Sequence, residues 1–142
     1  MQTIELEAEI MQISRYCEII IQILYMNSMM SLLKLITFAY IIKTGKHNLY
    51  TARSSKELAY KSISLISGDY KNFINDTEVI LKAIHILSSN KRIKIENSMV
   101  KAVHIVSVLN QIYEKNSFIY KAINESKKMS DRQFLKEVIS NV

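Results

Sequence analysis

Proline is absent from this chain of 142 residues, and glycine occurs only at Gly45 and Gly68. Few residues can therefore supply the fixed or positive φ angles of tight turns, which argues against β-sandwiches and β-barrels. Two isolated glycines also cannot build a phosphate-binding loop. Long helices are the structures that such a composition favours.

Cysteine occurs once, at Cys17, so no disulfide can form within the chain. The sequence does not open with a basic region followed by an uninterrupted apolar stretch, as an export signal would, and we expect a cytoplasmic protein. In the apolar residues 19–42 the only charge is Lys34, but Asn27 and Ser28 resemble a helix start within this stretch. We therefore expect two packed helices there and no contact with a membrane.

The sequence also lacks a recognisable cluster of catalytic or metal-binding residues. The three histidines are His47, His85 and His104. None of them has a His, Cys, Asp or Glu three or four residues away, as a metal site on one helix would require. Cys17 lies on an apolar stripe without a base nearby, which is typical of a buried structural thiol. We expect no metal, no cofactor and no enzymatic activity.

Apolar and basic side chains are plentiful. The chain is 49% hydrophobic and 23% charged, which is enough for one domain with its own core. Its net charge is +6, with 15 Lys against 4 Arg, and a diffuse lysine excess is weaker evidence for a phosphate-binding groove than clustered arginine. Residues 1–27 carry four Glu and one Arg, a net charge of −3, which leaves +9 on residues 28–142. We expect an acidic first helix on a basic body.

Apolar residues recur every three or four positions along most of the chain, which is the period of a helix. This spacing predicts helices over residues 3–26, 28–44, 54–66, 76–89 and 105–125, and one more after Ser130. Within residues 92–103 the period changes to two, which predicts a β-hairpin that turns at Asn97 and Ser98. The second predicted helix is apolar in almost every direction, so we expect it to be the most buried element.

Three helices (28–44, 54–66 and 76–89) followed by a hairpin have the element order of a winged helix. We therefore expect a mainly α, single domain over residues 1–142. A winged-helix-like core at 28–103 would be flanked by an N-terminal helix at 1–27 and C-terminal helices at 104–142.

In a DNA-binding winged helix, the third helix reads base edges and the hairpin lies beside the DNA backbone. The start of the third predicted helix carries Asp76 and Glu78, which phosphates would repel. On the hairpin, Arg92, Lys94 and Lys101 are candidate contacts to DNA phosphates, and a solvated strand face explains them equally well. We expect at most a non-specific DNA contact, and protein binding as the main role of this core.

The end of the chain has its own amphipathic segment. Ser130 and Gln133 form a capping box that predicts a helix start. One narrow face of this helix carries Phe134, Leu135, Val138 and Ile139. This apolar stripe has to be buried, either against the same domain or in a groove of a partner protein.

Two strings of this sequence look familiar together: NSMMSLLKLITFAYIIK at residues 27–43 and AINESKKMSDRQFLKEVI at residues 122–139. They resemble the small middle component of bacterial ABC-three-component systems, including the Lamassu type of anti-phage defence. In such systems a small protein accompanies an ATPase of the SMC or Rad50 type and an effector, commonly a nuclease. The resemblance implies a non-catalytic accessory subunit that helps to hold the effector inactive on the ATPase until foreign DNA is sensed.

Two other classes of function stay open from the sequence. The main alternative is a stand-alone winged-helix transcriptional regulator, which would bind DNA as a two-fold dimer. The other is a small helical toxin–antitoxin or phage accessory protein.

Overall fold

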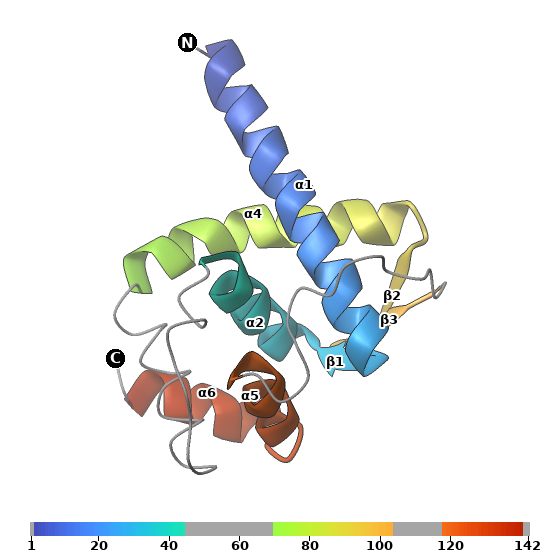
Figure 1. Ribbon diagram of the computed structural model, residues 1–142, viewed down its shortest axis with the longest axis vertical. Helices are drawn as coiled ribbons and strands as arrows, with labels where there is room; N and C mark the ends of the chain where they lie inside the picture. The colour runs from blue at the N-terminus through green and yellow to red at the C-terminus, as the bar shows by residue number, and fades with distance from the viewer. Residues whose placement is uncertain (1, 45–69, 104–117, 141–142) are drawn as a thin grey trace.

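The computed structural model describes residues 2–44, 70–103 and 118–140 (Figure 1). Over these ranges the chain is mainly helical with one small antiparallel sheet. The elements are α1 (Gln2–Asn27), β1 (Met29–Ser31), α2 (Leu32–Thr44), α4 (Tyr70–Ser89), β2 (Ile93–Glu96), β3 (Met99–Ala102), α5 (Phe118–Ser126) and α6 (Asp131–Ser140). No helix in these ranges is long and apolar enough to cross a membrane.

Helix α2 lies at the centre of the molecule (Figure 1). It contacts α1 and α4 on one side and α5 and α6 on the other. Every residue from Lys34 to Ile42 is buried. The prediction that this segment is the most buried element is therefore confirmed, and its apolar residues in nearly every direction are the reason.

Helix α1 packs across α4 and α2 with its C-terminal half (Figure 1). Tyr16, Ile19, Ile20, Ile23 and Leu24 are buried there as part of the main core. The N-terminal half of α1 continues past α4 and projects from the molecule (Figure 1). One helix thus joins the core to a projecting arm.

The hairpin is confirmed, and it belongs to a three-stranded sheet in the order β1-β3-β2. Strands β2 and β3 pair in register from Ile93 opposite Ala102 to Glu96 opposite Met99. The two-residue turn between them has positive φ angles of 51° at Asn97 and 63° at Ser98, as a type I′ hairpin turn requires. The twist of such a turn matches the twist of the two strands. The turn and the alternation of apolar and polar residues therefore specify the same register.

Strand β1 was not predicted, and the prediction that a helix begins at Asn27 or Ser28 is wrong. Ser28 has a φ of 67° and ends α1, with its N–H bonded to the carbonyl of Leu24 at 2.8 Å. The next three residues are extended and pair with β3. Helix α2 starts only after Ser31, whose hydroxyl accepts the N–H of Lys34 at 3.3 Å and so caps the helix.

Helix α4 starts at Tyr70, before the predicted start at residue 76. The predicted start is therefore wrong, because residue 76 lies inside the helix. The additional turns have tertiary support. The ring of Phe73 packs edge-on against that of Tyr40 in α2, with centroids 5.2 Å apart.

The C-terminal helices are partly as predicted. The predicted helix at 54–66 lies outside the described residues, and so does the start of the predicted helix at 105–125. The described end of the latter is α5, which ends at Ser126. The capping box before α6 is confirmed: Ser130 donates its N–H to Gln133 Oε1 at 3.0 Å, and Gln133 donates its N–H to Ser130 Oγ at 3.2 Å.

Candidate functional site

The sheet brings two of the three candidate phosphate contacts together. Lys94 on β2 stands directly opposite Lys101 on β3, and both side chains are exposed. On the other side of β3, Lys101 is opposite Met29 of β1. Cross-strand neighbours share one face of a sheet, so these two lysines form a small basic spot on the hairpin.

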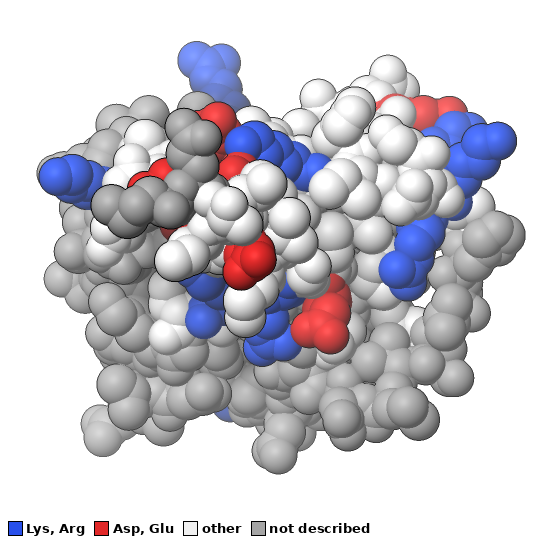
Figure 2. All heavy atoms as spheres, turned by 90° about the horizontal axis from the view of Figure 1, so that it is seen from above, with Lys and Arg blue, Asp and Glu red and all other residues white. Residues whose placement is uncertain are grey.

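An acidic neighbour limits this spot. Glu96 lies 2.8 Å from the amine of Lys94. The hydrogen bond and charge of Glu96 raise the pKa of Lys94, and Lys94, followed by Lys101, lowers the pKa of Glu96. Blue and red side chains are interspersed over the face drawn in Figure 2. The described part of that face has no continuous basic area of the kind that tracks a DNA backbone.

Arg92, the third candidate, faces a different neighbourhood. Its carbonyl accepts the N–H of Val103 at 3.0 Å, which closes the base of the hairpin. Its side chain lines a hollow beside α1. There the positive charge of Arg92 lowers the pKa of Cys17, whereas burial has the larger effect and raises it. Arg92 therefore lies at the base of the hairpin beside α1, and Lys94 and Lys101 pair further along its strands.

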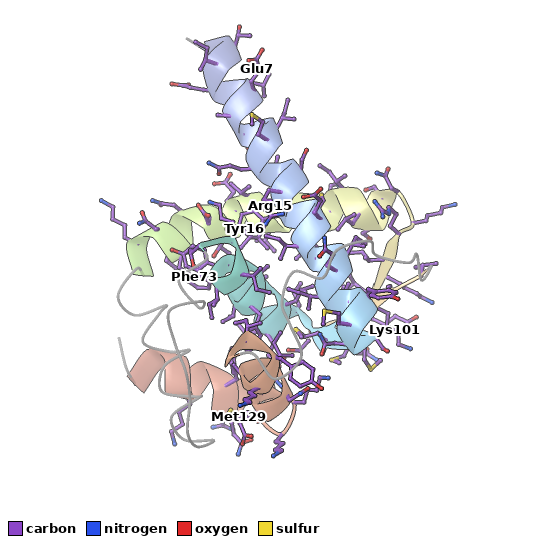
Figure 3. All side chains as sticks on the ribbon, viewed as in Figure 1. Glu7, Arg15, Tyr16, Phe73, Lys101 and Met129 are labelled. Atoms are coloured by element: carbon purple, nitrogen blue, oxygen red, sulfur yellow. The ribbon has the colours of Figure 1, made fainter. Side chains whose placement is uncertain are left out.

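Asp76, whose charge argued against phosphate binding by its helix, joins three helices. The Tyr16 hydroxyl in α1 donates to Asp76 Oδ2 at 2.7 Å, and the Lys43 amine in α2 lies 2.9 Å from the same oxygen. The Lys43 amine also lies 5.5 Å from the centre of the Tyr16 ring. Burial, followed by the contact with Asp76, raises the pKa of Tyr16 well above its usual range. Figure 3 shows Tyr16 where α1 crosses the other two helices.

The structure buries the first residue of the C-terminal stripe within the chain itself. Phe134 is 6% exposed, and its ring centroid lies 5.9 Å from that of Phe38 in α2. The side chains of Leu135, Val138 and Ile139 lie outside the described part of the structure. Phe134 therefore acts here as a core residue.

A buried lysine also attaches the C-terminal helices to α2, and sequence reasoning missed it. Lys34 is 8% exposed, and its amine donates to the carbonyl of Met129 in the turn between α5 and α6. Figure 3 shows Met129 at this turn. A second hollow, of about 440 Å³, opens beside this contact and is lined by Met29, Met30 and Met99 as well as Met129. Its flexible thioethers make this corner adaptable.

The projecting arm of α1 is the largest feature that the sequence reasoning missed as a site. Several of its apolar residues are more than half exposed: Ile4 70%, Leu6 57%, Ile10 53% and Met11 72%. Glu7 also lies on this arm, away from the other elements (Figure 3).

Where the arm meets the body, α1 and the end of α4 enclose an open groove of about 500 Å³. It is lined mainly by apolar side chains from both helices, among them Ile10, Ile13, Cys17 and Ile86. The Cys17 thiol is half-buried and lies 3.8 Å from the carbonyl of Ala83 in α4. We refer to this feature as the α1–α4 groove.

Within the described ranges, no three His, Cys, Asp or Glu side chains lie together as a metal site would need. His85 is exposed on α4, whereas His47 and His104 lie outside those ranges. Comparison with known proteins finds no significant match to a family model, a curated protein or a solved structure.

Proposed function

We propose that this chain is a non-catalytic accessory subunit of an anti-phage or anti-plasmid defence complex, in which it bridges an SMC- or Rad50-like ATPase and an effector nuclease. The resemblance of residues 27–43 and 122–139 to the small component of such systems suggests the complex. The physical support is a surface suited to binding protein.

The observation that carries the proposal is the projecting arm of α1. A helix that projects from its domain with Leu6 and Ile10 more than half exposed has apolar surface that a second protein would bury. Contiguous exposed apolar residues of this kind mark protein interfaces more often than they mark free surface. An accessory subunit needs such a surface for its partners. A dimeric regulator would need it for a second copy, but the net charge of −3 on residues 1–27 opposes the pairing of two such helices.

The finer architecture that we propose is a winged helix. In that fold a short strand between the first two helices pairs with the second strand of the hairpin. Strand β1 lies between α1 and α2 and pairs with β3, which supports this arrangement. On this assignment α1 is the first helix of the winged helix and α4 is the helix that precedes the wing, so the core begins in α1 and not at residue 28 as the sequence predicted.

The same element order favours the alternative, a winged-helix transcriptional regulator. Against it, Asp76 near the start of α4 is engaged by Tyr16 and Lys43, and Glu96 neutralises part of the wing. Both features leave few side chains available to hydrogen-bond with base edges. A weak, sequence-independent phosphate contact through Lys94 and Lys101 is compatible with either function.

The test is co-expression of this chain with the proteins encoded beside it, followed by purification and native mass spectrometry. We expect one complex containing an ATPase and a nuclease, and we expect the nuclease to leave the ATPase when this chain is omitted. A chain that purifies alone in the presence of both proteins, and binds one palindromic duplex as a two-fold dimer, would show that it is a regulator instead.

A further inference from the structure

A single apolar stripe runs along α1 from the core onto the projecting arm. Its residues alternate at spacings of four and three, the pattern of a coiled-coil seam: Leu6, Ile10, Ile13, Cys17, Ile20 and Leu24. Ile20 and Leu24 are fully buried in the core, whereas Leu6 and Ile10 are more than half exposed. The outer half of this α1 stripe has the pattern of a helix–helix contact but no partner helix among the described residues.

The α1–α4 groove lies where the stripe leaves the core. Ile10, Ile13 and Cys17 of the stripe form one wall, and Ile86 of α4, itself 40% exposed, forms part of the other. An occupant of this groove would contact the exposed stripe and the end of α4 together. A helix that lays an apolar face into a groove between two helices has this geometry.

One polar group in the groove lacks a donor. Gln22 lines the groove, and its Oε1 atom is buried without a hydrogen-bond partner in the described structure. A buried acceptor without a donor costs about 1–3 kcal/mol. Because this oxygen is covered, an occupant could bring an N–H group to it only if the Gln22 side chain turned toward the groove.

The charges beside the stripe indicate the character of the occupant. On the arm, Glu7 follows Leu6 and Glu9 precedes Ile10. Glu18 lines the groove but forms an ion pair with Arg15 at 3.2 Å, and Arg92 also lines the groove, so the acidic character lies on the arm. A basic residue already pairs with this acidic arm, because Lys82 of α4 forms an ion pair with Glu9. A second copy of α1 would place two acidic helices side by side, since residues 1–27 carry a net charge of −3, and like charges oppose such pairing.

We infer that the α1–α4 groove binds an amphipathic helix of a partner protein, and that this helix has an apolar stripe flanked by Lys and Arg. Its apolar residues cover Leu6, Ile10 and Ile13, and its basic residues face the acidic arm at Glu7. The inference rests on the proposed function only in requiring a protein partner, and it assigns the surface through which that partner binds.

The test uses the full chain and two synthetic helical peptides of about three heptads. Both peptides carry Leu at the seam positions, one with Lys and the other with Glu at the flanking positions. We expect the lysine peptide to bind by fluorescence anisotropy, more weakly as salt is raised, and the glutamate peptide to bind at least about tenfold more weakly, which equals ~1.4 kcal/mol.

Two adjacent residues provide matched variants. Ile10 lines the groove and Met11 does not, although both are exposed apolar residues on the same arm. Ile10→Asp should weaken the lysine peptide at least about tenfold, and Met11→Asp should leave its affinity unchanged. If Ile10→Asp lowers the melting temperature, Leu6→Asp replaces it, because Leu6 is 57% exposed on the same stripe.

Any of the following results would overturn the inference: no binding of the lysine peptide, equal binding of both peptides, equal losses with Ile10→Asp and Met11→Asp, or a dimer of the chain that Ile10→Asp dissociates. The last result would identify a second copy as the occupant. An intact ATPase–nuclease complex containing Ile10→Asp would also overturn the inference and leave the proposed function standing. Peptide binding in the absence of any ATPase–nuclease complex would support the inference and overturn the proposed function.

Discussion

The Tyr16 hydroxyl in α1 donates a hydrogen bond of 2.7 Å to Asp76 in α4, 60 residues further along the chain. Lys43 of α2 meets the same carboxylate oxygen at 2.9 Å, so one acidic side chain connects the three helices that form the main core. Tyr16 itself is 0% exposed. This contact fixes α1 at the point where its buried half ends and its projecting arm begins.

Replacement of Tyr16 by Phe should destabilise the chain by about 1–3 kcal/mol, because Asp76 loses a buried donor while the ring still fills its place. The free energy of unfolding in urea measures this loss. Tyr25→Phe is the control, since Tyr25 is 39% exposed and lies on the same helix. Equal stability of Tyr16→Phe and the parent chain would show that the hydrogen bond adds nothing to the contact.

The effect of Tyr16→Phe should depend on pH in the alkaline range. The fold raises the pKa of Tyr16 above its ordinary value of 10.0. A raised pKa means that the stabilisation is complete below the unfolded value and falls as the unfolded chain ionises above it. We therefore expect the stability of the parent chain to fall above pH ~10. Tyr16→Phe should lose less stability there, and parallel curves across that range would contradict the assignment.

A charge placed in the centre of α2 should unfold the protein. Ile36 is 9% exposed, and Asp at this position would be buried without a partner, at a cost comparable with the ~5–15 kcal/mol that stabilises a whole small domain. Leu33→Asp should cost less, because Leu33 is only half-buried. Thermal unfolding followed by circular dichroism measures both. Ile4→Asp, at a residue that is 70% exposed, is the control.

Local signals in the sequence predicted some elements well and missed others for one physical reason. The hairpin and the cap at Ser130 depend on neighbouring residues, so alternation and spacing were sufficient to find them. Strand β1 is only three residues long and exists by pairing with β3, about 70 residues away. The early start of α4 likewise depends on the contact between Phe73 and Tyr40. Short patterns carry no information about such distant partners.

The candidate site shows the same limit. The basic residues of the hairpin could be identified from the sequence, but their separation could not, because it depends on Arg92 turning toward α1. The exposed arm was visible only as an amphipathic helix. Its acidic character was evident from residues 1–27. Which half of the stripe is buried depends on where α4 crosses it, and no local pattern specifies a crossing point.

If the hairpin touches DNA, a double change of Lys94→Glu and Lys101→Glu should weaken binding about equally for every duplex. Each lost phosphate contact lowers the slope of log affinity against log salt by about 0.9. Arg92→Glu should have a smaller effect, because that side chain lines the α1–α4 groove. A double change of Lys121→Glu and Lys127→Glu, at two exposed residues, is the charge-matched control. Loss of affinity for one duplex alone would favour the regulator.

Removal of the chain after Lys128 should destabilise the domain rather than act only on partner binding. Phe134 is 6% exposed and packs on Phe38, and truncation of a buried Phe to Ala costs about 3–5 kcal/mol. We therefore expect Phe134→Ala to lower the midpoint of urea unfolding clearly and Arg132→Ala, at an exposed residue on the same helix, to leave it unchanged. The truncated chain should lose at least as much stability as Phe134→Ala. An unchanged unfolding curve of the truncated chain, together with loss of the ATPase–nuclease complex, would instead assign the last helix to a partner.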